Sequence, residues 1–422
     1  MTMHRKSTLL LISSIFWLNT THTDPVLPHY FVATPYYTLK SRTERKGLFT
    51  IDLYGVYGVT STGRNANNVK TNILQMYGLQ KMRMVGKNVD LAPFSPANAA
   101  ILTNLWHVAQ SNPLYATLEF NGRVAYKEGE IRAGFNITDN IFIACIVPFS
   151  HIAITNTTYV DTTPSDVSDA AWTNFLANFN SILTQTGLTF GESSNGGIDD
   201  IVLYTGWTKN LDDFQSLYFL DFTISIGASL GTAPARNEDQ LFSIARGYNR
   251  HKGFVTAFDL AFSPIENLTF GAGLSNVYLF KRTQSTRLQS APGQNGFVKL
   301  SKTDATCEPG SVYRIGGYLT YDYHILGITV AYSYVRQTPQ STFSTPTPAL
   351  FPPDVINTDS MFASWSQQVL GFALTADWAA DNPNKITFPR GSIFYNYIIK
   401  GDQTFLTNTV GGNLGVALTL DF

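Results

Sequence analysis

Apolar and polar residues alternate at period two through much of this chain, a pattern that predicts β-strands with two different faces. The last segment, 410–422, shows it most clearly. One face carries Val410, Leu414, Val416, Leu418, Leu420 and Phe422, and the other carries Gly411, Asn413, Gly415, Ala417, Thr419 and Asp421. Segments 215–230, 310–323 and 325–338 alternate in the same way. We interpret the apolar rows as facing lipid and the small or polar rows as facing a lumen.

Short turns and long loops alternate between these strands. The short turns lie at 138–140, 209–213, 264–267, 323–324 and 380–385, and the longer loops at 60–114, 155–195, 231–249, 284–309, 339–360 and 401–407. The strands then occupy 47–59, 115–138, 140–154, 196–209, 215–230, 250–263, 267–283, 310–323, 325–338, 361–379, 386–400 and 408–422. We predict an all-β, transmembrane, antiparallel up-and-down β-barrel of twelve strands, with short periplasmic turns and long extracellular loops.

The strand 115–138 changes phase along its length. Its apolar residues are first even-numbered (Leu118, Phe120, Val124, Tyr126) and then odd-numbered (Ile131, Ala133, Phe135, Ile137). A β-bulge near 127–130 in one long strand would explain the change. A tight turn there would instead add a strand, and a partner inside 60–114 would make fourteen strands, which is the alternative.

Two of the long loops contain more than coil. Residues 168–187 have the apolar spacing of an amphipathic helix, with Asp169 near its start and Gly187 near its end. Such apolar loops either fold into the barrel mouth and narrow it or pack on their own tips as small caps. The constriction candidates are Tyr77, Leu102 and Trp106 in the first loop and Trp172, Phe175 and Phe179 in the second.

Composition agrees with a barrel. Charged residues make up only 14% of the chain, against about 25% in soluble proteins, and the mean hydropathy is near zero. Residues 1–23 resemble a secretory signal peptide, although a short membrane anchor is the alternative. We therefore expect a periplasmic leader at 24–46, an outer-membrane barrel at 47–422 and a Gram-negative-type host. The net charge of −1 gives no support to nucleic-acid binding.

Two segments carry a family resemblance. Residues 135–149 (FNITDNIFIACIVPF) are similar to "YGITDRLELGVSLPY", and residues 196–203 (GGIDDIVL) are similar to "GIGDITLGLKY". Both segments occur in the phenol-degradation meta-pathway transporter family of outer-membrane proteins, relatives of the FadL-type hydrophobic-compound channels. The chain departs from the pattern at Asn136 and at the doubled Asp199-Asp200. The resemblance implies uptake of small aromatic or apolar compounds.

No residue pattern predicts catalysis, a cofactor or a metal centre. Residues 227–231 match the nucleophile-elbow pattern around Ser229, but no helix pattern follows. A barrel lipase would need a Ser–His pair on neighbouring strands near the outer rim. His151 is the best histidine for this, but its neighbour Ser150 points to the opposite face of the strand. Cys145 and Cys307 are expected to be free thiols.

The clearest cluster of functional candidates is acidic. Six aspartates fall near predicted periplasmic strand ends on lumenal faces, namely Asp52, Asp221, Asp259, Asp322, Asp377 and Asp421. Arg132 and Arg390 lie at similar depth, and Glu119, Arg123 and Arg314 are predicted higher in the lumen. The aspartates either form a collar that favours cations or belong to a hydrogen-bonded network that fills a narrow barrel.

These observations favour a channel for passive uptake of small solutes, not an enzyme. The alternatives are a plugged structural or adhesive barrel and a barrel lipase. The expected partners are the lipid bilayer, small solutes and the barrel-assembly machinery, which would read the terminal strand ending in Phe422.

Overall fold

The computed structural model describes residues 48–108, 112–212, 216–294, 296–339, 342–378 and 387–419. The predicted signal peptide (1–23) and leader (24–46), together with Asp421 and Phe422, lie outside the described residues.

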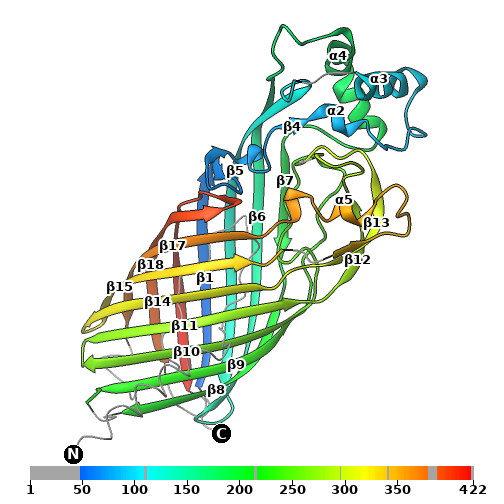
Figure 1. Ribbon diagram of the computed structural model, residues 1–422. Coiled ribbons are helices and arrows are strands. Elements are labelled where there is room, and N and C mark those ends of the chain that lie inside the picture. The colour runs from blue at the N-terminus through cyan, green and yellow to red at the C-terminus, as the bar shows by residue number, and fades with distance from the viewer. Residues whose placement is uncertain are drawn as a thin grey trace, which may run out of the picture.

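Twelve antiparallel strands form one closed ring (Figure 1). Each pairs with its neighbour in sequence, and β1 pairs with β20 to close the barrel. The ring consists of β1 (Leu48–Thr60), β5 (Thr117–Asn136), β6 (Ile141–Asp161), β8 (Val202–Asp212), β9 (Phe219–Ser229), β10 (Gly253–Ile265), β11 (Leu268–Leu279), β14 (Val312–Tyr323), β15 (Leu326–Gln337), β17 (Trp365–Asp377), β18 (Thr387–Asp402) and β20 (Thr409–Thr419). The predicted twelve-stranded barrel is confirmed.

Two short strands join the sheet without entering the ring. β4 (Gln80–Lys81) pairs with β5, and β7 (Ser193–Ile198) pairs with β6 above β8. The fourteen-stranded alternative is therefore wrong as a description of the barrel, because both strands lie beside the ring rather than in it.

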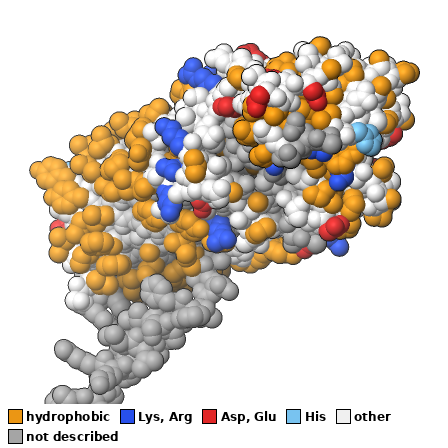
Figure 2. Space-filling view, turned by 45° about the horizontal axis from the view of Figure 1, so that its top comes forward, with side chains coloured by type: hydrophobic (Ala, Val, Ile, Leu, Met, Phe, Trp, Pro, Cys, Tyr) orange, Lys and Arg blue, Asp and Glu red, His pale blue; other side chains and the backbone are white. Residues whose placement is uncertain are grey.

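The outer surface of the barrel carries the apolar rows. In β20, Leu414 is 73% exposed while its neighbours Asn413 and Gly415 are partly buried. In β9, Ile224 and Ile226 point outward while Thr223 and Ser225 are buried. Figure 2 shows the resulting continuous hydrophobic surface over the barrel. A closed barrel pairs its backbone groups from strand to strand and presents apolar side chains to hydrocarbon, so this is a transmembrane barrel of the outer membrane.

The long loops fold over the outer end of the barrel (Figure 1). They contain two small sheets, one formed by β12 (Arg282–Arg287), β13 (Lys302–Glu308) and β16 (Thr342–Ser344), and the other by β2 (Thr62–Arg64), β3 (Lys70–Asn72) and β19 (Thr404–Phe405). Their helices are η2 (Ile73–Gln75), α2 (Met82–Val85), α3 (Pro96–His107), α4 (Ala170–Gln185), α5 (Pro353–Ile356) and η3 (Ser360–Phe362). In the described ranges, each helix is too short or too polar to cross a bilayer.

The helix predicted at 168–187 is present as α4. The Asp169 carboxylate accepts a hydrogen bond from the Trp172 N–H at 2.8 Å and caps the first turn. Gly187 follows the last turn with φ +73°, the left-handed conformation that glycine adopts without steric cost.

The predicted bulge near 127–130 is wrong. β5 pairs with β1 in unbroken register from Phe49↔Phe135 to Thr60↔Val124. A register shift does occur between β5 and β6, but higher up, between Asn121 and Arg123. The even-numbered side chains of β5 face into the barrel along its whole length, so the backbone keeps one phase. In the extracellular half of β5 the apolar residues are the even-numbered ones, which pack under the loops. In the periplasmic half the apolar residues are the odd-numbered ones, which face lipid.

Apolar cores occupy the outer part of the molecule in two layers. The upper layer joins the loops to the inner faces of β5 and β6, with Phe120, Val124, Ile152 and Ile154 all buried. We call this layer, with α3 and α4, the cap. A second layer lies on the inner barrel wall and contains Ile146, Val202, Val255, Val277, Leu279, Val312, Val335 and Trp365, with Tyr248 from a loop.

Glycines make room for aromatic rings inside the barrel. A Cβ on Gly271 would lie 2.0 Å from the ring of Tyr318, and a Cβ on Gly411 would lie 2.5 Å from the ring of Phe394. In each case the ring lies over a glycine of the neighbouring strand. Large side chains thereby fit into the narrow interior of a twelve-stranded barrel.

Candidate functional site: the lumen and the pocket below the cap

The inner wall of the barrel is apolar in its outer third. Val255 on β10 pairs with Val277 on β11, which in turn pairs with Val312 on β14. All three side chains are at least 97% buried. Channels of the porin type have polar interiors, whereas this part of the barrel interior is a packed apolar layer.

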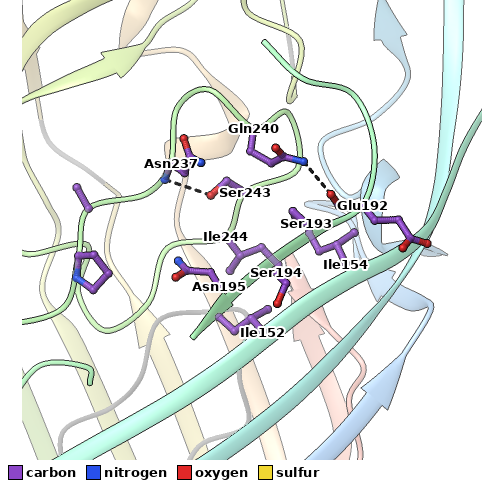
Figure 3. A pocket seen from close by; sticks show the side chains of 12 residues that line it. Ile152, Ile154, Glu192, Ser193, Ser194, Asn195, Asn237, Gln240, Ser243 and Ile244 are labelled. Atoms are coloured by element: carbon purple, nitrogen blue, oxygen red, sulfur yellow. Dashed lines mark hydrogen bonds between the residues drawn. The ribbon is translucent and has the colours of Figure 1, made fainter. Parts of the chain in front are cut away.

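A pocket of about 360 Å³ lies between β6, β7 and the loop before β10 (Figure 3). Ile152 and Ile154 from β6 form one side, and the loop before β10 forms the other. The remaining lining residues are Glu192, Ser193, Ser194, Asn195, Pro234, Ala235, Asn237, Gln240, Ser243 and Ile244. The Gln240 side chain donates to the Glu192 carbonyl at 2.9 Å, and Ser193 donates to the Phe242 carbonyl at 3.3 Å. These bonds hold the loop against β7.

The doubled aspartate of the sequence motif anchors the loop that forms this pocket. Asp199 and Asp200 occupy the break between β7 and β8 and are both buried. Asp199 pairs with Arg246 at 3.3 Å, and Asp200 accepts the N–H of Ala233 at 2.9 Å. Asp200 also accepts the N–H of Tyr248. Both ends of the 230–252 loop are thus fixed to the barrel wall by carboxylates.

Five of the six candidate aspartates lie on inner faces, and Asp421 lies outside the described residues. Asp52 forms an ion pair with Arg390, including an Nε–Oδ1 hydrogen bond of 2.8 Å. Asp377 stands directly opposite Arg390 in the β17–β18 register. The remaining three, Asp221, Asp259 and Asp322, interact electrostatically with the buried hydroxyl of Tyr318. The structure therefore brings these carboxylates together in two groups, one with a cation and one around a tyrosine.

Two further candidate arginines are buried on inner faces, with Arg132 directly opposite Asp52 in the β1–β5 register and Arg314 nearer the outer end of the barrel. Arg132 pairs with Glu130 and places its guanidinium 4.4 Å from the centre of the Tyr54 ring. Arg314 is 2% exposed, two positions along β14 from Val312 of the apolar layer. Charged and apolar side chains thus share the interior at neighbouring depths.

The predictions for Glu119 and Arg123 are wrong. They alternate along β5 with Leu118, Phe120 and Val124, which are buried in the cap, so both side chains point away from the lumen. Above the bilayer the outer face of this strand meets water, which accommodates charge without cost.

The six candidate constriction residues belong to the cap. Tyr77, Leu102, Trp172, Phe175 and Phe179 are each buried in its core. Trp106 is partly buried, and the Lys87 ammonium lies 4.6 Å from the centre of its ring. Figure 1 shows α3 and α4 above the barrel mouth, carried by the long β5–β6 hairpin. Whether they narrow a solute path stays a prediction.

The serines considered for catalysis, Ser150 and Ser229, are buried on inner faces. The structure does place another serine against a histidine, because Ser194 Oγ lies 2.9 Å from His151 Nε2 on the exposed outer face of β6 and β7. A pairing between Gly196 and His151 in the same ladder lets the imidazole lie over a residue without a side chain. The sequence pattern does not point to Ser194, because residues 155–195 were expected to be loop.

Within the described ranges, no group of three His, Cys, Asp or Glu side chains is arranged to hold a metal ion. In the same ranges, neither Cys145 nor Cys307 is in a disulfide bond.

The chain was compared with known proteins. No family model matches it, and no curated protein matches it. Among solved structures, an outer-membrane channel from Pseudomonas putida F1 has 8% identity and a TM-score of 0.49, covering 89% of this chain and 96% of that one. The Pseudomonas putida toluene transporter TodX has 8% identity and a TM-score of 0.33, covering 95% and 98%. The Ralstonia pickettii toluene transporter TbuX has 10% identity and a TM-score of 0.31, covering 96% and 100%.

Proposed function

We propose that this protein is an outer-membrane channel for passive, non-enzymatic uptake of small apolar or aromatic compounds. The observation that carries the proposal is the apolar interior of the outer part of the barrel. It consists of the buried layer on the inner wall and of a pocket whose apolar side is formed by Ile152, Ile154 and Ile244 of the cap. A lumen built for hydrated ions would not bury valine and isoleucine on facing strands. The sequence resemblance at 135–149 and 196–203 agrees with this solute class.

The pocket sets the size of the solute. At about 360 Å³ it lies near the lower end of ligand pockets, roughly 300–1,000 Å³. That volume suits a molecule of one ring with a few substituents. Its apolar surface comes from Ile152, Ile154 and Ile244, and its serine, asparagine and glutamine side chains supply hydrogen bonds for one polar substituent.

The acidic residues at the periplasmic end have two possible roles, and we favour the structural one. Asp52 and Arg390 neutralise each other, and Asp377 faces the same guanidinium. Carboxylates held beside a guanidinium in this way fill space in a narrow barrel and contribute less to cation preference than solvated carboxylates would. The terminal strand ending in Phe422 remains the proposed contact for the assembly machinery.

A matched pair of substitutions on β6 tests the channel. Ile152→Trp fills the pocket from the inner face, whereas Ile143→Trp adds the same side chain on the lipid-facing surface, where Ile143 is 46% exposed. In proteoliposomes loaded with a solute-sensing dye, we expect Ile152→Trp to slow entry of a monocyclic aromatic solute and Ile143→Trp to leave entry unchanged. Equal entry in both variants would refute the pocket as part of the path. No entry in any protein would favour the plugged adhesive barrel.

A barrel lipase is the second candidate, favoured by the Ser194–His151 hydrogen bond. A nucleophile needs a base within hydrogen-bond reach, and the base needs a third group that orients it. Among the described residues, no carboxylate or amide contacts the other ring nitrogen of His151, so the pair lacks the group that would orient the base. We therefore prefer the channel. Hydrolysis of a phospholipid ester that is abolished by Ser194→Ala and kept by Ser150→Ala would establish the lipase instead.

A further inference from the structure

Four basic residues meet at the outer ends of β10 and β11. The two chain segments continue the antiparallel pairing beyond the strands, because the Phe280 N–H donates to the Lys252 carbonyl at 2.8 Å. Farther along, the Arg282 guanidinium donates to the Arg250 carbonyl at 2.9 Å. We call Arg250, Lys252, Lys281 and Arg282 the basic patch. Arg250, Lys252 and Lys281 are exposed, and Arg282 is partly buried.

The basic patch adjoins the lipid-facing surface directly. Phe254 on β10 and Tyr278 on β11 point outward and are 44% and 49% exposed, and Phe280 beyond them is 49% exposed. The next residues along both segments are the cations. Figure 2 shows Lys and Arg side chains lined up where the hydrophobic surface of the barrel ends. The patch therefore stands at the level at which lipid acyl chains meet their headgroups.

The positive charges of the patch are not balanced within the protein. In the described ranges, none of its four side chains forms an ion pair, although Arg287 and Lys302 of the same loop both pair with Asp239. Burial lowers the pKa of Arg282, and the nearby charge of Arg250 lowers it further. Like charges on neighbouring chain segments destabilise the fold, and an anionic ligand would remove that cost.

Other outward-facing cations continue along the same border. Lys127 on β5, Arg336 on β15 and Lys400 on β18 are all exposed at the outer parts of their strands. The described residues of the short turns at the opposite end of the barrel carry Asp139, Asp212 and Glu266 with one lysine, Lys209. This asymmetry points to a ligand of the outer leaflet, rather than to anionic lipid in general.

We propose that the basic patch binds the phosphate groups of the phosphorylated glycolipid in the outer leaflet. Arginine presents paired N–H groups that match a phosphate, and two arginines side by side suit a headgroup with more than one negative charge. Phe254, Tyr278 and Phe280 lie next to the patch on its membrane side, where they contact the acyl chains of the same lipid.

The test uses the complete barrel in neutral nanodiscs and titrates it with bis-phosphorylated lipid A. Each cation near a membrane surface contributes about fivefold in affinity, so R250Q/R282Q should weaken binding by about 25-fold. R250K/R282K keeps the charge and should bind within a few-fold of the original. K70Q/K81Q removes two exposed cations from the first loop, away from the patch, and should bind as the original does.

Two further arms identify the source of the phosphate. Dephosphorylated lipid A should bind the original protein as weakly as lipid A binds R250Q/R282Q, and excess inorganic phosphate should fail to compete. Unchanged affinity in R250Q/R282Q would overturn the proposal, as would an equal loss in K70Q/K81Q or full competition by free phosphate. If R250Q/R282Q does not fold, K252Q/K281Q replaces it with the same expected loss and the same refuting result.

Discussion

A buried ion pair holds two loops of the cap together, and breaking it should open the cap locally. Lys299 and Asp359 are each at least 98% buried, and their side chains form a direct salt bridge. Burial lowers the pKa of Lys299, and the Asp359 carboxylate opposes this by stabilising the ammonium. Asp359 also accepts the N–H of Met361 at 3.0 Å through its other oxygen. Asp359→Asn keeps that oxygen but leaves the buried ammonium without its ion-pair partner.

The expected magnitude follows from the burial. Removing one partner of a buried ion pair costs about 3–5 kcal/mol. Because about 1.4 kcal/mol is a factor of ten, the opening equilibrium of the 353–362 segment should rise roughly 100- to 4,000-fold. Native-state hydrogen exchange measures this equilibrium at the Met361 amide.

An exposed ion pair of the same loop region supplies the control. Lys302 and Asp239 lie 2.9 Å apart, with side chains 36% and 56% exposed. Lys302→Gln should cost about 0–1 kcal/mol and change exchange at Met361 little. The reasoning fails if the two variants accelerate exchange equally, or if Asp359→Asn lowers the stability of the whole barrel without a local change at 353–362.

Three further predictions concern a thiol, the carboxylates and a glycine. Burial raises the pKa of Cys307 to about 12, so its thiol should react slowly with maleimide at pH 8 in the folded protein. In a variant with the other cysteine replaced by serine, a mass-spectrometric time course should show far slower labelling of the folded protein than of the denatured protein. Asp322→Asn with Asp377→Asn should lower cation-over-anion permeability if the acidic collar acts in selectivity, and an unchanged reversal potential in a salt gradient would reject that role. Gly271→Val pushes a methyl group into an aromatic ring and should lower the free energy of unfolding in urea by about 1–3 kcal/mol, whereas an unchanged midpoint would contradict the close contact.

The barrel was predictable because its strands repeat one simple rule. Each strand faces lipid on one side and a polar or small-residue interior on the other, so apolar and polar residues alternate along it. The alternation of short turns and long loops then predicts how the strands follow one another around the ring. The rule fails on β5 because one strand passes through two environments. Ile131 meets lipid, whereas Phe120 lies under the cap, so the apolar row changes face without any change in the backbone. Interpreting that change as a bulge also led to the wrong prediction that Glu119 and Arg123 face the lumen.

The pocket and the basic patch were not predictable for a different reason. Each joins residues from separate loops, and sequence spacing gives no information on how loops pack. Ile244 reaches the pocket from one loop, and β7 begins at Ser193, inside a segment (155–195) that was expected to be loop. Only the doubled aspartate at 199–200 marked the region in the sequence, and its role in anchoring Arg246 required the folded loop.

The pairing of β1 with β20 is the only contact in the ring that joins strands distant in sequence. All other pairs form between consecutive hairpin arms, so the ring has a single seam. Gly55 faces Gly412 across it, and Asp52 faces Gly415. Large apolar residues are also paired across it, with Ile51 opposite Val416 and Leu53 opposite Leu414, so the closure combines backbone pairing with cross-strand apolar pairs. The geometry of the ring singles out no starting strand, so moving the chain ends to another periplasmic turn should relocate the seam and preserve the ring on refolding in detergent, whereas assembly in the cell would still use the terminal strand that ends in Phe422.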